Sequence, residues 1–156
     1  MTEISKYIVN FDGFSVEKIV EEWKWLIGNN LTPILISCIG DLFLIDTDEK
    51  IYWLNTGEGK IEFIAKNRNE FNDKLTDKTL VNELFMCDLV EQIFDSGILL
   101  AENQLLSFKK LPVIGGKYKV ENFYKLTIEE HFSITGEIHR QLSSLPDGTE
   151  VKLKFF

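Results

Sequence analysis

The sequence contains few of the residues on which most metal sites and nucleophilic enzymes depend. Only two histidines and two cysteines occur in 156 residues, too few for a disulfide scaffold or a four-cysteine zinc site. The short motifs typical of serine hydrolases, phosphate-binding loops, dinucleotide folds, zinc proteases and dithiol oxidoreductases do not occur in it. The sequence therefore predicts a protein that is not an enzyme and has no bound cofactor.

Long hydrophobic runs are also missing. The longest, such as 42–45 and 98–101, fall far short of the roughly 18 residues that suggest a membrane span. No basic N-terminal region precedes an apolar block, so we expect no signal peptide. The chain is 44% hydrophobic and 27% charged, as in ordinary globular proteins. We therefore expect one domain over residues 1–156 in the reducing cytoplasm. Nothing in the sequence predicts the oligomeric state.

The negative charge is concentrated in the middle of the chain. The formal net charge is -8 at pH 7, and residues 41–102 contain 14 acidic and 6 basic residues. Backbone phosphates are repelled by such a surface, which argues against direct binding to nucleic acid. Charge alone leaves two interpretations open, a basic protein partner or a charge that only keeps the protein soluble.

Four short hydrophobic segments and the turns between them predict an antiparallel β-meander. The segments are rich in Ile, Leu, Phe, Tyr and Trp, and glycine or Asn, Asp and Thr residues separate them. Their connections are too short for helical crossovers, so the strands must pair antiparallel. The segments are 33–38, 41–46, 51–54 and 60–65.

Helices are expected before and after this meander in the sequence. An apolar stripe predicts a helix over 16–27, which Ser15 can cap and Gly28 can end. Asp77 can cap a second one over 78–95. A capping box at Thr127–Glu130 begins a third that runs to about Leu145. Further strands are predicted at 118–125 and 149–155. Together these elements predict an α+β domain with helices packed on one face of an antiparallel sheet.

The two histidines lie on the same side of the third predicted helix. His131 and His139 are eight residues apart, about 12 Å along the axis, which is too far for both to bind one metal ion at ~2.0–2.1 Å. Either could act as a general base beside Glu130 or Glu137, but a neutral, hydrogen-bonded histidine at the edge of the core is the favoured interpretation.

Acidic and aromatic residues gather about the second predicted hairpin. Their spacing is not that of a calcium-binding loop, so no metal site is predicted. A solvated hairpin end is one interpretation. The other is a partner-binding surface, because an acidic rim can attract a cationic protein that an aromatic anchor then holds. The residues are Asp41, Asp46, Asp48, Glu49, Tyr52, Trp53 and Glu58.

Two blocks of sequence resemble a bacterial protein family. The first contains IGDLFLID at 39–46, IYWL at 51–54 and Gly57. The second contains GGKY at 115–118, Glu121 and Asn122, GEIHRQ at 136–141 and DGT at 147–149. Over roughly residues 31–153, in matching order, they are similar to the C-terminal domain of immunity proteins against DNase toxins of the type VI secretion system.

This resemblance implies an inhibitor that binds a cognate toxin and has no catalytic residues to carry over. A toxin that cleaves nucleic acid needs a cationic cleft, which an acidic surface can approach and block. We therefore expect a basic, nuclease-like toxin as partner, and the acidic and aromatic residues of the second hairpin as the contact. The alternative is a small-ligand-binding domain that uses the sheet and helix face near His131 and His139.

Overall fold

The computed structural model describes residues 2–146, which form seven β-strands, six α-helices and four 3-10 helices. The strands are β1 (Ile8–Val9), β2 (Thr32–Ser37), β3 (Leu42–Ile45), β4 (Ile51–Asn55), β5 (Lys60–Ala65), β6 (Gln104–Phe108) and β7 (Phe123–Thr127). The α-helices are α1 (Val16–Val20), α2 (Lys24–Ile27), α3 (Arg68–Lys74), α4 (Lys78–Phe85), α5 (Cys87–Asp95) and α6 (Ile128–Leu142). The 3-10 helices are η1 (Thr2–Tyr7), η2 (Glu21–Trp23), η3 (Pro112–Ile114) and η4 (Val120–Asn122). The strand predicted at 149–155 lies outside the described residues.

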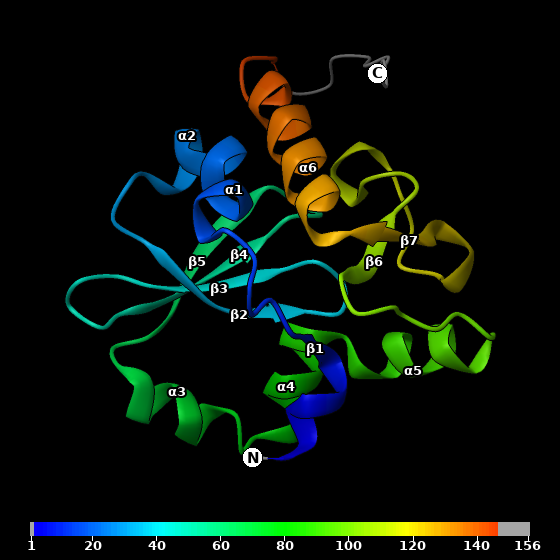
Figure 1. Cartoon of the computed structure of the whole chain (residues 1–156), viewed down its shortest axis with the longest axis horizontal. Helices are drawn as coiled ribbons and strands as arrows, with labels where there is room; N and C mark the ends of the chain where they lie inside the picture. Colours follow the sequence, from blue (N-terminus) through cyan, green and yellow to red (C-terminus); the bar gives the residue numbers. More distant parts are fainter. Residues whose placement is uncertain (1, 147–156) are drawn as a thin grey trace.

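The predicted β-meander is confirmed as the main sheet. Strands β1 to β5 lie side by side in the order of the sequence, and each pairs antiparallel with the next (Figure 1). The register sets Tyr52 opposite both Leu44 and Phe63. Strands β6 and β7 form a second antiparallel pair, which the Leu106 amide joins to the end of β2 by donating to the Cys38 carbonyl at 2.7 Å. The α+β class is therefore confirmed.

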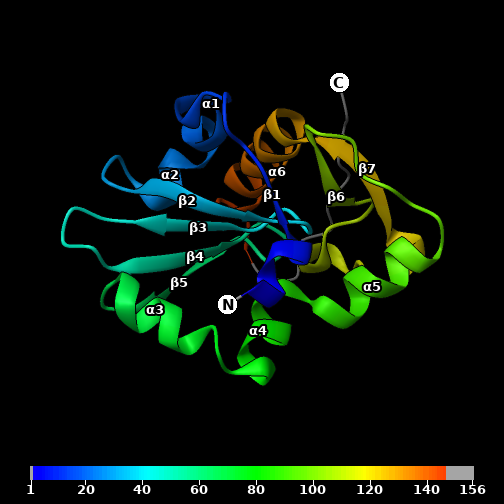
Figure 2. The same ribbon diagram turned by 60° about the horizontal axis from the view of Figure 1, so that its bottom comes forward.

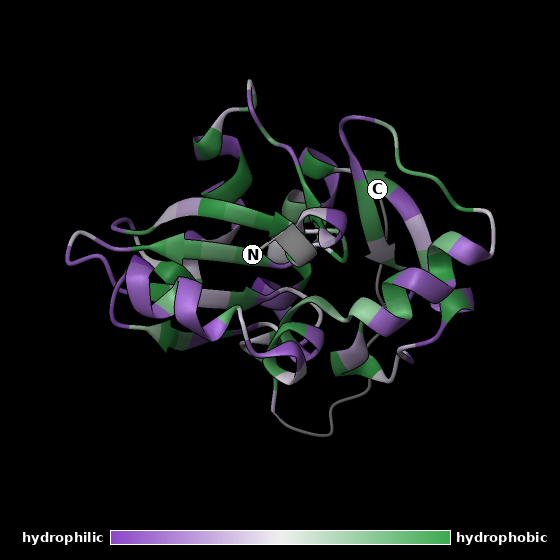
Figure 3. Ribbon diagram, turned by 90° about the horizontal axis from the view of Figure 1, so that it is seen from below, coloured by the Kyte–Doolittle hydropathy of each residue, from purple (hydrophilic) through white to green (hydrophobic). Residues whose placement is uncertain are grey.

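The helices cover both faces of the main sheet, so their predicted placement on one face is wrong. Successive side chains of β3 point to opposite sides: Leu42 and Leu44 pack under α1, α2 and α6, whereas Phe43 packs against α3 and α4 (Figure 1). In the view from below, the strands are mostly hydrophobic and the helices carry both hydrophobic and hydrophilic residues (Figure 3). The uninterrupted apolar run of β3 is typical of a strand buried on both sides.

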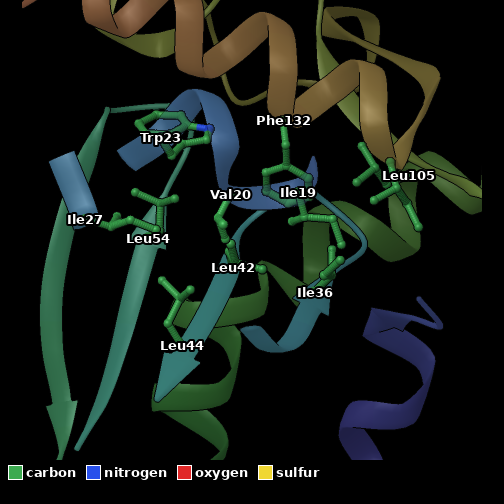
Figure 4. Close-up of a cluster of buried hydrophobic side chains, with 11 residues drawn as sticks. Ile19, Val20, Trp23, Ile27, Ile36, Leu42, Leu44, Leu54, Leu105 and Phe132 are labelled. Carbon is green, nitrogen blue, oxygen red and sulfur yellow. The ribbon is translucent and has the colours of Figure 1, made fainter. Parts of the chain in front are cut away.

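The first predicted helix is interrupted by a 3-10 turn where it meets α6. Ser15 caps it as expected, and Gly28 ends it at φ 75°, but residues 21–23 form η2. Here the backbones of η2 and α6 approach closely, since a Cβ on Gly136 would lie 2.6 Å from the Glu22 carbonyl oxygen. The turn buries Trp23 in a cluster with residues of α1, α6 and the sheet (Figure 4).

The second predicted helix, 78–95, is broken in two. Asp77 caps α4 by accepting from the Thr79 and Leu80 amides, but Met86 adopts a left-handed conformation with φ 50° and ψ 49°. This turn directs α5 toward β6 and β7 and away from the main sheet, as Figure 2 shows. Val90 and Ile93 of α5 pack there in a cluster with residues of both strands.

Helix α3 and strand β6 were not predicted, and the strand predicted at 118–125 begins later in the chain. Asn67 caps α3 through the Glu70 amide, a signal present in the sequence. Residues 120–122 form η4, so the strand of this region, β7, begins at Phe123 and pairs with β6. The predicted capping box forms, since the Thr127 hydroxyl accepts from the Glu130 amide at 3.2 Å. The Glu130 carboxylate, however, accepts from the Thr127 hydroxyl at 2.7 Å, whereas in the usual capping box it accepts from the backbone amide of the capping residue.

Among residues 2–146, no helix has the length and hydrophobicity needed to cross a membrane.

Candidate functional site

The seven residues expected at a partner-binding surface do not form one surface. Asp46, Asp48 and Glu49 lie in the turn between β3 and β4, whereas Glu58 lies in the turn between β4 and β5, at the other end of β4. Cross-strand pairing places Tyr52 on the face of Leu44 and Trp53 on the face of Phe43. The expected surface is therefore divided between two ends and two faces of the sheet.

Asp41 is not a surface residue, which corrects its place in the expected set. It is 2% exposed. Its carboxylate accepts hydrogen bonds from the Thr56 amide at 3.0 Å and from Nε1 of Trp53 at 3.1 Å. Burial raises the pKa of this carboxyl group to about 7, although these hydrogen bonds oppose the rise. Asp41 thus connects β3 to the β4–β5 turn inside the protein.

The β3–β4 turn keeps its acids close together at the end of the hairpin. Oδ1 of Asp46 accepts from the amides of Asp48 and Lys50, both at 2.9 Å, so this half-buried carboxylate closes the turn. Asp48 and Glu49 are exposed. Among the described residues, no salt bridge engages Asp46, Asp48 or Glu49. These three acids therefore form a negative group without an ion-pair partner among the described residues.

Glu58, in the β4–β5 turn, forms a contact with the loop that follows β6 and lies apart from the acids of the β3–β4 turn. Its carboxylate accepts a hydrogen bond of 2.7 Å from the Tyr118 hydroxyl, whose pKa is raised by partial burial and by this bond. The Tyr118 ring packs edge-on against Phe108. Glu58 therefore helps to fasten the β4–β5 turn to the loop that follows β6.

His131 is fully buried and holds α6 to the end of β2 and to β6. Its Nε2 lies 2.8 Å from the Gly40 carbonyl oxygen, and its Nδ1 lies 2.8 Å from the Ser107 hydroxyl. Because a carbonyl only accepts, we assign the ring proton to Nε2, and the Ser107 hydroxyl then donates to Nδ1. Burial lowers the pKa of His131 to about 4, so the ring is neutral near pH 7.

The Ser107–His131 distance is that of a catalytic nucleophile and its general base, but the pair lacks the access to substrate that catalysis requires. Such a pair must reach a substrate, and the base must accept protons near the working pH. Here both side chains are buried, and the imidazole binds a proton only near pH 4. The pair therefore stabilises the packing of α6.

His139 makes the second connection of α6, two turns later. Its Nε2 donates to the Thr56 carbonyl oxygen at 2.7 Å, and its ring lies 5.4 Å from that of Trp23. Burial lowers the pKa of this histidine too. The favoured interpretation of both histidines, neutral and hydrogen-bonded at the core, agrees with these contacts.

Two glycines let the histidine rings approach the turns. A Cβ on Gly40, at φ +83°, would lie 2.2 Å from Nε2 of His131. A Cβ on Gly59, at φ +71°, would lie 2.3 Å from Nδ1 of His139. Glycine is favoured at both positions for two reasons: the backbone φ is positive, and a Cβ would have no space beside the imidazole ring.

The second block of the resemblance has a similar internal role. Asn122 holds the loop after β6: Oδ1 accepts from the Lys110 amide at 3.0 Å, while Nδ2 donates to the carbonyls of Lys110 and Lys117 at 2.9 and 2.8 Å. A Cβ on Gly116 would meet the Lys110 carbonyl oxygen. In both blocks, the residues that make these contacts stabilise the protein internally.

A pocket of about 650 Å³ lies between α6 and the β6–β7 sheet. Its lining is mostly apolar, with two lysines and two buried hydroxyl groups, and neither histidine is part of it. The lining residues are Ser107, Phe108, Lys109, Lys110, Leu111, Ile114, Tyr124, Ile134, Thr135 and Ile138. Within residues 2–146, no group of three or more His, Cys, Asp or Glu residues has the arrangement of a metal site.

Comparison with protein families agrees with the resemblance drawn from the sequence. Residues 65–139 match the family described as T6SS immunity protein Tdi1, C-terminal, which confirms that resemblance over this segment. The match begins at the last residue of β5 and ends at His139. It includes most of the second block and lies wholly after the first. No curated protein gave a significant match.

Proposed function

We propose, from the premise that residues 65–139 are similar to a type VI secretion immunity protein, that this chain binds a cognate toxin and neutralises it in the cytoplasm. The match is the observation that carries this proposal. The site supports inhibition by binding, because the only serine–histidine pair in the described part of the chain is buried and internal. In this role the protein needs no cofactor.

The partner we propose is a nuclease whose active-site cleft is basic. Such an enzyme must hold phosphates with cationic residues, which an acidic inhibitor attracts over long range. The net charge of -8 and the negative group of Asp46, Asp48 and Glu49 support this choice. The exposed members of this group, Asp48 and Glu49, would approach the cleft first.

Charge reversal at the β3–β4 turn tests the proposed contact. Asp48→Lys together with Glu49→Lys should slow association with the cognate toxin at least tenfold at low salt, because rim charges act mainly on the association rate. The matched control is Asp73→Lys with Glu83→Lys, two exposed acids of α3 and α4. Equal association rates for both double variants would contradict an acidic contact at this turn.

The pocket beside α6 favours a second candidate function, binding of a small apolar ligand. Its volume of about 650 Å³ lies in the range of ordinary ligand sites. His131 and His139, which the sequence suggested for a small-ligand site, do not line this pocket. Ile134 and Ile138 would contact the ligand instead. A ligand retained by the purified protein in native mass spectrometry, and lost in Ile138→Glu, would support this candidate. Unliganded protein would contradict it.

A further inference from the structure

We propose that an aromatic patch formed by Tyr52 and Phe63 is the hydrophobic anchor of the toxin-binding surface. This inference rests on the proposed function and adds to it a residue, Phe63, that the expected contact set did not contain. The partner it fits is a cationic protein surface with an apolar recess.

The aromatic patch is exposed on the ordered sheet. Phe63 lies on β5, the last strand of the main sheet, and is 54% exposed, more than any other aromatic side chain that the structure describes. It is the cross-strand neighbour of Tyr52, and the two rings meet edge to face with centroids 5.8 Å apart. Because both rings stand on strands, their positions are fixed before a partner arrives.

The patch is not needed to complete the core beneath it. Tyr52 and Phe63 share a face with Leu44 and Leu54, which pack with residues of α1 and α2. The buried cluster on this face, with the hydrophobic side chains packed against it, includes Ile61 of β5 but neither aromatic ring. Exposed aromatic rings of this kind are enriched among the residues that dominate binding energy at interfaces.

The neighbouring charges select a cationic partner. The β3–β4 turn leads into β4, of which Tyr52 is the second residue, and contains the acids Asp46, Asp48 and Glu49 and one base, Lys50. Among the described residues, none of these three acids forms a salt bridge. Single-stranded nucleic acid also stacks on aromatic rings, but it requires a positively charged groove beside them. The acidic turn disfavours that ligand and favours a basic protein.

The patch is more suited to contact by side chains than to addition of a strand. Nζ of Lys74 in α3 donates to the Ile64 carbonyl of β5 at 2.7 Å. A lysine at a sheet edge is one of the devices that disfavour pairing with another chain. We therefore place the contact on the face of the sheet at Phe63.

The test compares two exposed hydrophobic residues. Phe63→Ser should weaken binding of the cognate toxin, in a catalytically inactive form, by on the order of 10- to 100-fold in calorimetry. Leu99→Ser, at an exposed hydrophobic residue after α5, should change the Kd less than threefold. Thermal unfolding of both variants verifies that they fold, and Phe63→Leu should restore part of the affinity if the variant with serine is unstable.

Three other outcomes overturn the inference in distinguishable ways. If the wild-type protein binds and Phe63→Ser binds equally well, the patch is not the anchor and the proposed function stands. If the wild-type protein does not bind the toxin, the proposed function itself fails. If Phe63→Ser converts a dimer to a monomer in sedimentation without changing toxin affinity, a second copy of this chain occupies the patch.

Discussion

Two buried groups with opposite responses to pH, Asp41 and His131, allow the packing of α6 to be tested by titration. Burial raises the pKa of Asp41 from 3.8 to about 7 and lowers that of His131 from 6.5 to about 4. Between pH 4 and 7 folded Asp41 binds a proton that the unfolded chain releases, so acidification adds stability through this group. Between pH 4 and 6.5 unfolded His131 binds a proton that the folded protein excludes, so acidification removes stability.

The two contributions have similar size. Each pH unit in these windows changes the free energy of unfolding by about 1.4 kcal/mol per group, so each group contributes about 3 kcal/mol between pH 6.5 and 4.5. In the wild-type protein the contributions of Asp41 and His131 to the free energy of unfolding nearly cancel. The lowered pKa of His139 then leaves a net loss of stability on acidification. Asp41→Asn should therefore lose about 3 kcal/mol more than the wild-type protein over this interval, while His131→Gln should lose about 3 kcal/mol less.

Urea unfolding at pH 4.5, 5.5 and 6.5 measures these differences. Trp23 and Trp53 give a fluorescence signal from both faces of the main sheet. Leu99→Ser is the control, because this exposed side chain has no titratable group. The reasoning is refuted if Asp41→Asn follows the wild-type pH dependence, since the buried carboxyl group would then not titrate near neutral pH.

Three further substitutions test individual contacts by their effect on the free energy of unfolding. Gly40→Ala places a Cβ against the ring of His131 at a positive φ and should cost at least about 3 kcal/mol; a loss below about 1 kcal/mol would contradict the close contact. Asn122→Ala removes three hydrogen bonds from the loop 110–117 and should cost about 2 kcal/mol, with faster proteolysis of that loop. Asp77→Ala removes the cap of α4 and should cost about 1 kcal/mol.

Local signals in the sequence were sufficient for the meander and for the helix caps. The turn residues between strands, the cap at Asp77 and the box at Thr127 each act within four or five positions. Their interactions therefore form almost independently of the rest of the fold. The same locality explains why the antiparallel pairing of β2 to β5 followed from the pattern of short hydrophobic runs and turns.

Features that depend on tertiary contacts could not be predicted in this way. The break at Met86 places α5 against β6 and β7, and no glycine or proline marks it. The covering of both faces was indicated only by the uninterrupted apolar run of β3. The interruption of the first helix depends on Gly136, more than 100 residues away from Glu22 in the sequence.

The candidate site was limited by the same difficulty. Asp41 and Asp48 look alike in the sequence, but one is buried under hydrogen bonds from Thr56 and Trp53 and the other is exposed. Phe63 was counted among the strand residues of the meander, since an exposed and a buried phenylalanine cannot be told apart without knowing which parts of the face are covered.

The central claim, that this chain neutralises a toxin by binding it, is tested most directly by a titration of activity. Purified wild-type protein is added to the cognate toxin, and residual cleavage of DNA or RNA is measured against the molar ratio. Our account predicts a linear loss of activity that reaches zero at a fixed stoichiometry, with no turnover of the inhibitor. Full toxin activity in the presence of a large molar excess of the folded protein would contradict it.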